Sequence, residues 1–91
     1  EADVIFDRGL ALLLNKDFQN AITAFGDVTE KDSDYALAYY CSAIASARLN
    51  NDSNMISSLK KAVDKDPKLK EMALNDLEFN KYAGAISTAL K

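Results

Sequence analysis

Residues 5–33 read IFDRGLALLLNKDFQNAITAFGDVTEKDS and residues 39–67 read YYCSAIASARLNNDSNMISSLKKAVDKDP, the same pattern repeated after 34 positions. Equivalent positions agree in size or role: small, apolar or turn-forming in both blocks. The matched pairs are Gly9/Ala43, Ala21/Met55, Phe25/Leu59, Val28/Ala62 and Ser33/Pro67. This period is typical of a helix–turn–helix unit stacked on copies of itself. The sequence therefore predicts an all-α fold containing two such units.

The composition fits one small soluble domain covering residues 1–91. Apolar residues make up 48% of the chain, and only three Gly and one Pro interrupt it, which favours helices. A formal net charge of −3 argues against a nucleic-acid partner, which would require a basic face. No apolar run approaches twenty residues, so we expect no membrane insertion.

Apolar residues at spacings of three and four predict the helices of the two units. The expected ranges are 4–14, 18–29, 35–49 and 52–64, the last capped by Asp52 or Ser53. Asp3 and Asp17 are the expected N-caps of the first two helices. Gly9 lies in mid-helix, where glycine costs about 0.8–1 kcal/mol relative to Ala. We expect the partner helix to approach closely there.

The remainder of the chain is expected to close the stack. Asp66 and Pro67 predict the start of a fifth helix, with Asp as the cap and Pro at the first helical position. The apolar residues Phe79, Tyr82, Ile86 and Leu90 predict a last helix broken near Gly84. This tail has no second half that matches the repeat, which favours a capping segment.

These residues resemble the tetratricopeptide repeat, whose pattern is Trp-x2-Leu-Gly-x2-Tyr, then Ala-x3-Phe, then Pro. The first unit reads Ile5-x2-Arg8-Gly9-x2-Leu12, then Ala21-x3-Phe25; the second reads Tyr39-x2-Ser42-Ala43-x2-Ser46, then Met55-x3-Leu59 and Pro67. Arg8, Ser33, Ser42 and Ser46 depart from the pattern. The resemblance implies a right-handed α-solenoid of antiparallel helix pairs, with repeats at 2–34 and 35–67 and a capping segment at 68–91. The stretch from Asp76 is similar to terminal segments of some bacterial members.

The residue inventory argues against an enzyme. The chain has no His, so the commonest general base and imidazole metal ligands are missing. Cys41, the only cysteine, lies among small residues and is expected to be a buried, inert thiol. We therefore expect no catalytic residues, cofactor or metal ion.

The resemblance implies a scaffold or adaptor that binds a peptide or protein segment in a concave groove lined by the first helix of each unit. The equivalent positions on these helices predict the groove residues Phe6, Leu10, Leu13, Tyr40, Ile44 and Arg48. Leu74 and Glu78 would continue this row. A row of this composition suits an amphipathic helix or an apolar peptide.

A second interpretation stays open. The same apolar row could pack on upstream residues, on the capping tail or on another copy of the chain, which would make it a structural or self-associating piece of a longer solenoid. The sequence begins at Glu1, which suggests a mature form or an excised segment. It leaves both the bacterial cytoplasm and the periplasm open as locations.

Overall fold

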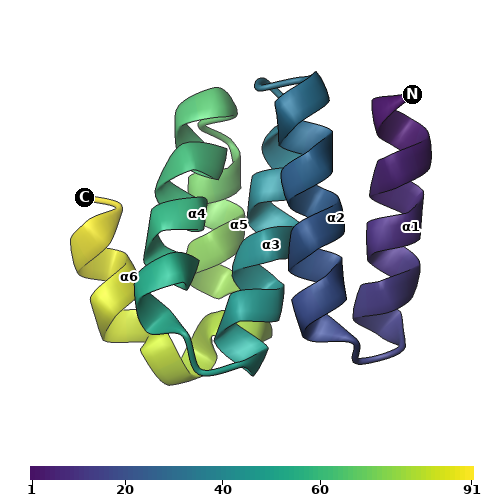
Figure 1. The fold of residues 1–91 in the computed structure, drawn as a ribbon. Helices are drawn as coiled ribbons and strands as arrows, with labels where there is room; N and C mark the ends of the chain where they lie inside the picture. The colour runs from purple at the N-terminus through teal and green to yellow at the C-terminus, as the bar shows by residue number, and fades with distance from the viewer.

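The computed structural model describes residues 1–91, and every regular element in it is helical (Figure 1). The predicted all-α class is confirmed. The elements are α1 (Ala2–Leu14), α2 (Phe18–Lys31), α3 (Ala36–Arg48), α4 (Asp52–Lys65), α5 (Leu69–Asn75), the 3-10 helix η1 (Leu77–Tyr82) and α6 (Ala83–Ala89). None of the helices has the length and apolar character needed to cross a membrane.

The 34-residue period of the sequence is also a period of the backbone. Helices α1 and α3 both have 13 residues, α2 and α4 both have 14, and their bounds differ by one period. Each hairpin turn holds one residue in the left-handed region, Lys16 (φ 63°) and Asn50 (φ 59°). After α2 and α4 the chain extends at Asp32 (φ −145°) and Asp66 (φ −142°). The turn chemistry therefore repeats along with the helices.

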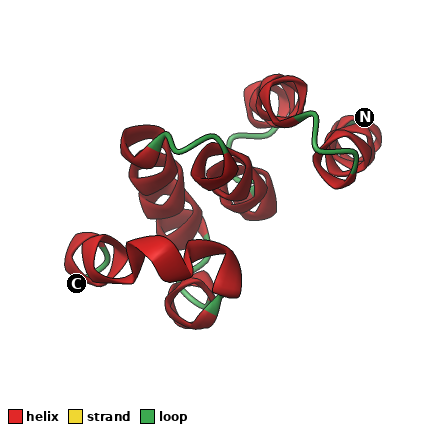
Figure 2. Cartoon of the chain, turned by 90° about the horizontal axis from the view of Figure 1, so that it is seen from below, coloured by secondary structure: helices red, strands yellow, loops and turns green.

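Consecutive helices pack against each other from α1 to α4 and run in opposite directions, as the short turns require (Figure 1). Seen from below, α2 and α4 lie on one side of the molecule (Figure 2). The other side is formed by α1, α3, α5 and η1. The first helices of the two units thus share a face with the C-terminal elements.

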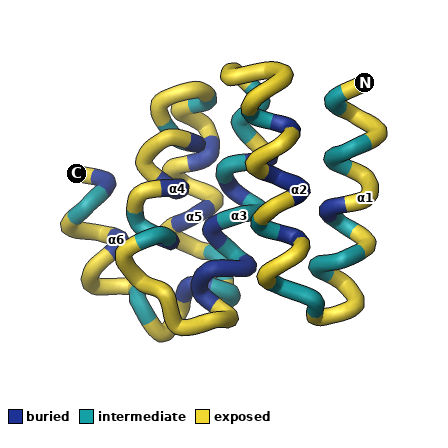
Figure 3. The backbone as a smooth tube through the Cα atoms, viewed as in Figure 1, coloured by how far each residue is buried: buried dark blue, intermediate teal, exposed yellow.

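The buried residues form two unequal clusters. The smaller cluster joins α2 to α3 and contains Ala21, Phe25, Val28 and Ala38. The larger cluster joins α3 to α6 and contains Tyr40, Ala43, Ala47, Met55, Leu59, Ala62, Leu69, Ala73, Phe79, Ile86 and Leu90. Gly9 is the only buried residue of α1, and the rest of that helix is half-buried or exposed (Figure 3). Leu12 and Tyr39, two positions of the repeat pattern, are half-buried at the edges of these clusters.

Gly9 and Phe25 explain how α1 and α2 pack so closely. A Cβ added to Gly9 would lie 2.6 Å from Cε1 of Phe25, so the ring occupies the space that a side chain would need. One period later, Ala43 and Leu59 are both fully buried in the larger cluster. Because Leu59 is smaller than its equivalent Phe25, it leaves room for the methyl group of Ala43. The predicted close approach at Gly9 is confirmed.

Two predicted caps are wrong. Helix α1 begins at Ala2, and Asp3 instead accepts a hydrogen bond from the hydroxyl of Tyr35 at 2.6 Å. Helix α4 is capped by Asn51, whose Oδ1 accepts from the backbone N–H of Asn54 at 3.2 Å. Asp52 is therefore the first residue of α4, and residues 49–51 form the hairpin turn.

The C-terminal boundaries also differ from the predicted ones. Helix α5 begins at Leu69 rather than Pro67, although Oδ1 of Asp66 does accept from the N–H of Lys68 at 3.2 Å. The predicted break at Gly84 lies earlier, where η1 gives way to α6 after Tyr82. Gly84 is inside α6.

Candidate binding surface

Three of the six predicted groove residues line one pocket between α1, α3 and η1. The pocket has a volume of about 220 Å³ and is lined by Leu13, Leu14, Lys16, Phe18, Ile44, Arg48 and Glu78. We call it the α1/α3 pocket. Leu13 and Leu14 come from the last turn of α1, and Ile44 comes from the middle of α3. Leu14 is 84% exposed, so an apolar side chain stands open to a partner at the mouth of the pocket.

The charged wall of the α1/α3 pocket is held in place by contacts within the chain. Arg48 donates from Nε to Oε1 of Glu78 at 2.9 Å and from Nη2 to Oε2 at 3.3 Å. The hydrogen bond with Glu78 raises the pKa of Arg48. The guanidinium also lies 5.5 Å from the ring centre of Phe18. This wall is therefore a paired charge stacked on an aromatic ring.

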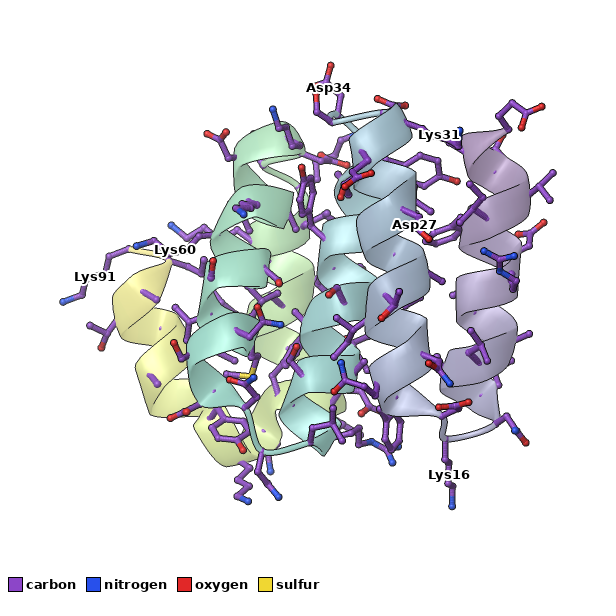
Figure 4. The ribbon with its side chains drawn as sticks, viewed as in Figure 1. Lys16, Asp27, Lys31, Asp34, Lys60 and Lys91 are labelled. Atoms are coloured by element: carbon purple, nitrogen blue, oxygen red, sulfur yellow. The ribbon has the colours of Figure 1, made fainter.

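Lys16 supplies a cation without a partner at the same pocket. It extends into solvent from the turn between α1 and α2 (Figure 4), and neither of the two ion pairs of the chain includes it. Since Arg48 and Glu78 offset each other, Lys16 gives the pocket a net positive rim. An incoming carboxylate would find its complement there.

Phe6 and Leu10 lie further along α1, and both are half-buried against the smaller cluster. The ring centre of Phe6 is 5.6 Å from that of Phe25 and 5.0 Å from that of Tyr35. The hydroxyl of Tyr35 is held by Asp3, and this bond, with burial and nearby carboxylates, raises the pKa of Tyr35 to about 12. Phe6 thus belongs to an aromatic group within the chain and presents only part of its surface.

Tyr40 is placed differently from the other five predicted groove residues. It is 3% exposed, and the C-terminal segment covers it. Its hydroxyl donates to Oδ2 of Asp76 at 2.6 Å, and its ring meets Phe79 edge-on at 5.6 Å. Burial, followed by the bond to Asp76, raises the pKa of Tyr40 far above its ordinary value. Tyr40 therefore contacts its own chain and offers no surface to a partner.

Phe18 and Lys16 were not predicted as part of the surface. Phe18 begins the second predicted helix and Lys16 lies between the first two, so neither belongs to the first helix of a unit. Both reach the α1/α3 pocket because the tight turn brings the start of α2 beside the end of α1. The sequence did contain a signal for Phe18, because it is an aromatic residue directly after the turn between two predicted helices.

Cys41 is half-buried, and burial raises the pKa of its thiol to about 11, which keeps it protonated at neutral pH. No three Cys, Asp or Glu side chains lie close enough together to hold a metal ion.

No family model, curated protein or solved structure matches the chain.

Proposed function

We propose that this chain is a non-catalytic protein–protein interaction module of the tetratricopeptide type, a right-handed solenoid of two helical hairpins with a C-terminal cap. Its ligand is a peptide or protein segment bound at the α1/α3 pocket. The observation that carries this proposal is the pocket itself: apolar side chains from the first helix of each unit face one opening, with a free cation at its rim.

The repeated geometry supports the family assignment. Helix bounds, left-handed turn residues and extended inter-unit residues all recur after one period. Gly9 meets Phe25 where the family pattern pairs a glycine with an aromatic residue of the second helix. These features belong to the backbone as well as to the sequence, so they support the resemblance independently of residue type.

The shape and chemistry of the α1/α3 pocket support a protein ligand. A concave apolar site with few polar groups anchors side chains of an extended or helical segment. Leu14 and Ile44 provide apolar walls on two different helices, so one ligand side chain would touch both units.

A matched pair of α1 variants tests this function. Leu14 is 84% exposed at the pocket, and Val4 is 73% exposed elsewhere on the same helix, so aspartate at either position should leave the fold intact. Peptides selected from a displayed random library on the wild-type chain should lose binding at least about tenfold on L14D and keep it on V4D. Selection that yields no peptide sensitive to L14D contradicts the proposed function.

Self-association is the second candidate, and the repeat offers a specific observation for it. Ala38 and Ala45 of α3 are fully buried, whereas their equivalents Val4 and Ala11 on α1 are exposed. The outer face of α1 is therefore free at positions that α3 has covered. Light scattering separates the candidates: a dimer abolished by V4D favours self-association through this face, and a monomer at all concentrations excludes it.

A further inference from the structure

A cleft separates the second helices of the two units. It lies between α2 and α4 over α3, on the side of the molecule opposite α5 and η1 (Figure 1, Figure 2). Its volume is about 160 Å³, and residues of all three helices line it. We call it the α2/α4 cleft. It shares no residue with the α1/α3 pocket, so a ligand bound here would be distinct from the segment proposed above.

Ser58 brings a buried hydroxyl group to the α2/α4 cleft. The residue is 9% exposed, and its hydroxyl takes part in none of the hydrogen bonds within the chain. Every fully enclosed side-chain oxygen or nitrogen of the chain has a partner, so this hydroxyl reaches the open space of the cleft. One period earlier the position is Ala24, which is 4% exposed, so the packing itself requires only a methyl group there. The hydroxyl of Ser58 is therefore available to a ligand.

Three other donors at the cleft are also without a partner in the chain. The hydroxyls of Ser42 and Ser57 make no hydrogen bond, and Lys61 belongs to neither ion pair. Nζ of Lys61 lies 6.0 Å from the ring centre of Tyr39, which also lines the cleft. Lys61 is the only charged residue of the lining, whereas Asp27 takes its place one period earlier (Figure 4). The cleft is thus positively charged on a chain whose formal net charge is −3.

The wall contributed by α2 is mostly apolar. Ile22 and Phe25 belong to it, and a Cβ added to Gly26 would have no atom within 4 Å. Thr29 is the polar residue of this wall, and its hydroxyl already donates to the carbonyl oxygen of Gly26 at 3.0 Å. The unpaired donors therefore come from α3 and α4, and the carbon atoms of a ligand would contact α2.

We propose that the α2/α4 cleft binds a phosphate group. Three hydroxyls and an ammonium group are available to donate, and no carboxylate lines the cleft to repel an anion. A phosphate monoester presents three acceptor oxygens and a charge of about −1.5 to −2 at pH 7, which matches this donor set better than a carboxylate does. The apolar wall favours a monoester over the inorganic ion, because it would cover the carbon atoms next to the phosphate.

NMR titration of the intact, isotope-labelled chain tests the inference with two probes. One is inorganic phosphate, and the other is a blocked tripeptide with phosphoserine between two glycines, each compared with sodium chloride at equal ionic strength. Both should give saturating shifts of the amide signals around Ser42, Ser58 and Lys61, and the tripeptide should bind about threefold or more tightly than the ion. Equal or tighter binding of inorganic phosphate would assign the site to the free ion and reject the monoester. Shifts that do not saturate, or that chloride reproduces, overturn the inference.

Two lysine variants separate the cleft from the net charge of the chain. Lys60 and Lys61 are adjacent and exposed on α4, but Lys60 does not line the cleft (Figure 4). K61Q should weaken phosphate binding about threefold or more, and K60Q should leave it nearly unchanged. An equal loss in both variants would show that phosphate responds to overall charge alone, which contradicts the inference.

The variant S58A tests the buried hydroxyl. It should weaken phosphate binding about tenfold, because a hydrogen bond to a charged group is lost. Its melting temperature without phosphate should be unchanged or higher, since the hydroxyl has no partner in the folded chain. A lower melting temperature together with unchanged phosphate affinity would give Ser58 a structural role and reject the site. L14D, at the α1/α3 pocket, should leave phosphate binding unchanged, so this inference and the proposed function can fail separately.

Discussion

Gly9 and Phe25 divide the space between α1 and α2 differently from the way Ala43 and Leu59 divide it between α3 and α4. A methyl group at Gly9 would meet a ring that is 1% exposed and has no room to move. We therefore expect G9A to lower the free energy of unfolding by about 1–3 kcal/mol, although alanine favours helix elsewhere. Urea unfolding followed by circular dichroism measures the change.

The second unit supplies the control for that variant. The double change G9A/F25L recreates the pairing of Ala43 with Leu59 and should recover part of the loss of G9A. Gly26 has no atom within 4 Å of an added Cβ, so G26A should stabilise the protein by up to about 1 kcal/mol. If G9A were as stable as G26A, the ring of Phe25 would have to move and make room for the added methyl group, and this prediction would be wrong.

Three ionisable side chains predict that the protein loses stability at alkaline pH. The pKa of Cys41 rises from 9.0 to about 11 and that of Tyr35 from 10.0 to about 12, and the pKa of Tyr40 is raised as well. Folded molecules therefore hold protons that unfolded molecules release, and the free energy of unfolding falls as pH rises from 9 towards 12. Below pH 9 this contribution is fully present.

Denaturant midpoints between pH 8 and pH 11.5 check this alkaline slope. Replacing Tyr40 by Phe removes one of the three groups and should flatten the slope, while also lowering stability at pH 8 because Asp76 loses its donor. A slope unchanged in Y40F would contradict the assigned role of this hydroxyl.

At the scale of elements, the 3-10 helix η1 is held against α3 by one buried ring and several exposed polar contacts. Phe79 is 1% exposed, so F79A should cost about 3–5 kcal/mol. E78Q breaks an ion pair that lies at the surface and should have a much smaller effect. Thermal unfolding of both variants, with F79L as an intermediate case, compares the two contributions.

Periodicity predicted the elements that repeat and failed where a contact between distant residues decides the structure. The first four helices follow from apolar spacing, and all eight of their ends lie within two residues of the predicted ends. Asp3 is not a cap because Tyr35, 32 positions away, takes its carboxylate. Tyr40 is buried because residues 76–82 fold back over α3, and a 3-10 helix has no apolar period to predict its path. Of the residues that line the α1/α3 pocket, the sequence therefore predicted Leu13, Ile44, Arg48 and Glu78 and missed Lys16 and Phe18.

For the whole molecule, the unequal clusters imply unequal local stability. The larger one has eleven buried residues across α3 to α6, whereas the smaller one has four, and α1 buries only Gly9. Amide hydrogen exchange should therefore be fastest in α1 among the first four helices and slowest in α3 and α4. Equal protection in α1 and α4 would show that the protein opens as a single cooperative unit.

Because of this difference in burial, we expect α1 to be the less stable wall of the α1/α3 pocket and α3 the more stable one. A ligand segment that contacts both helices would stabilise α1 against α3. Amide hydrogen exchange in α1 should therefore be the first to slow when the ligand binds. The melting temperature should then rise with ligand concentration. Thermal unfolding measurements would therefore be enough to screen a peptide library for ligands.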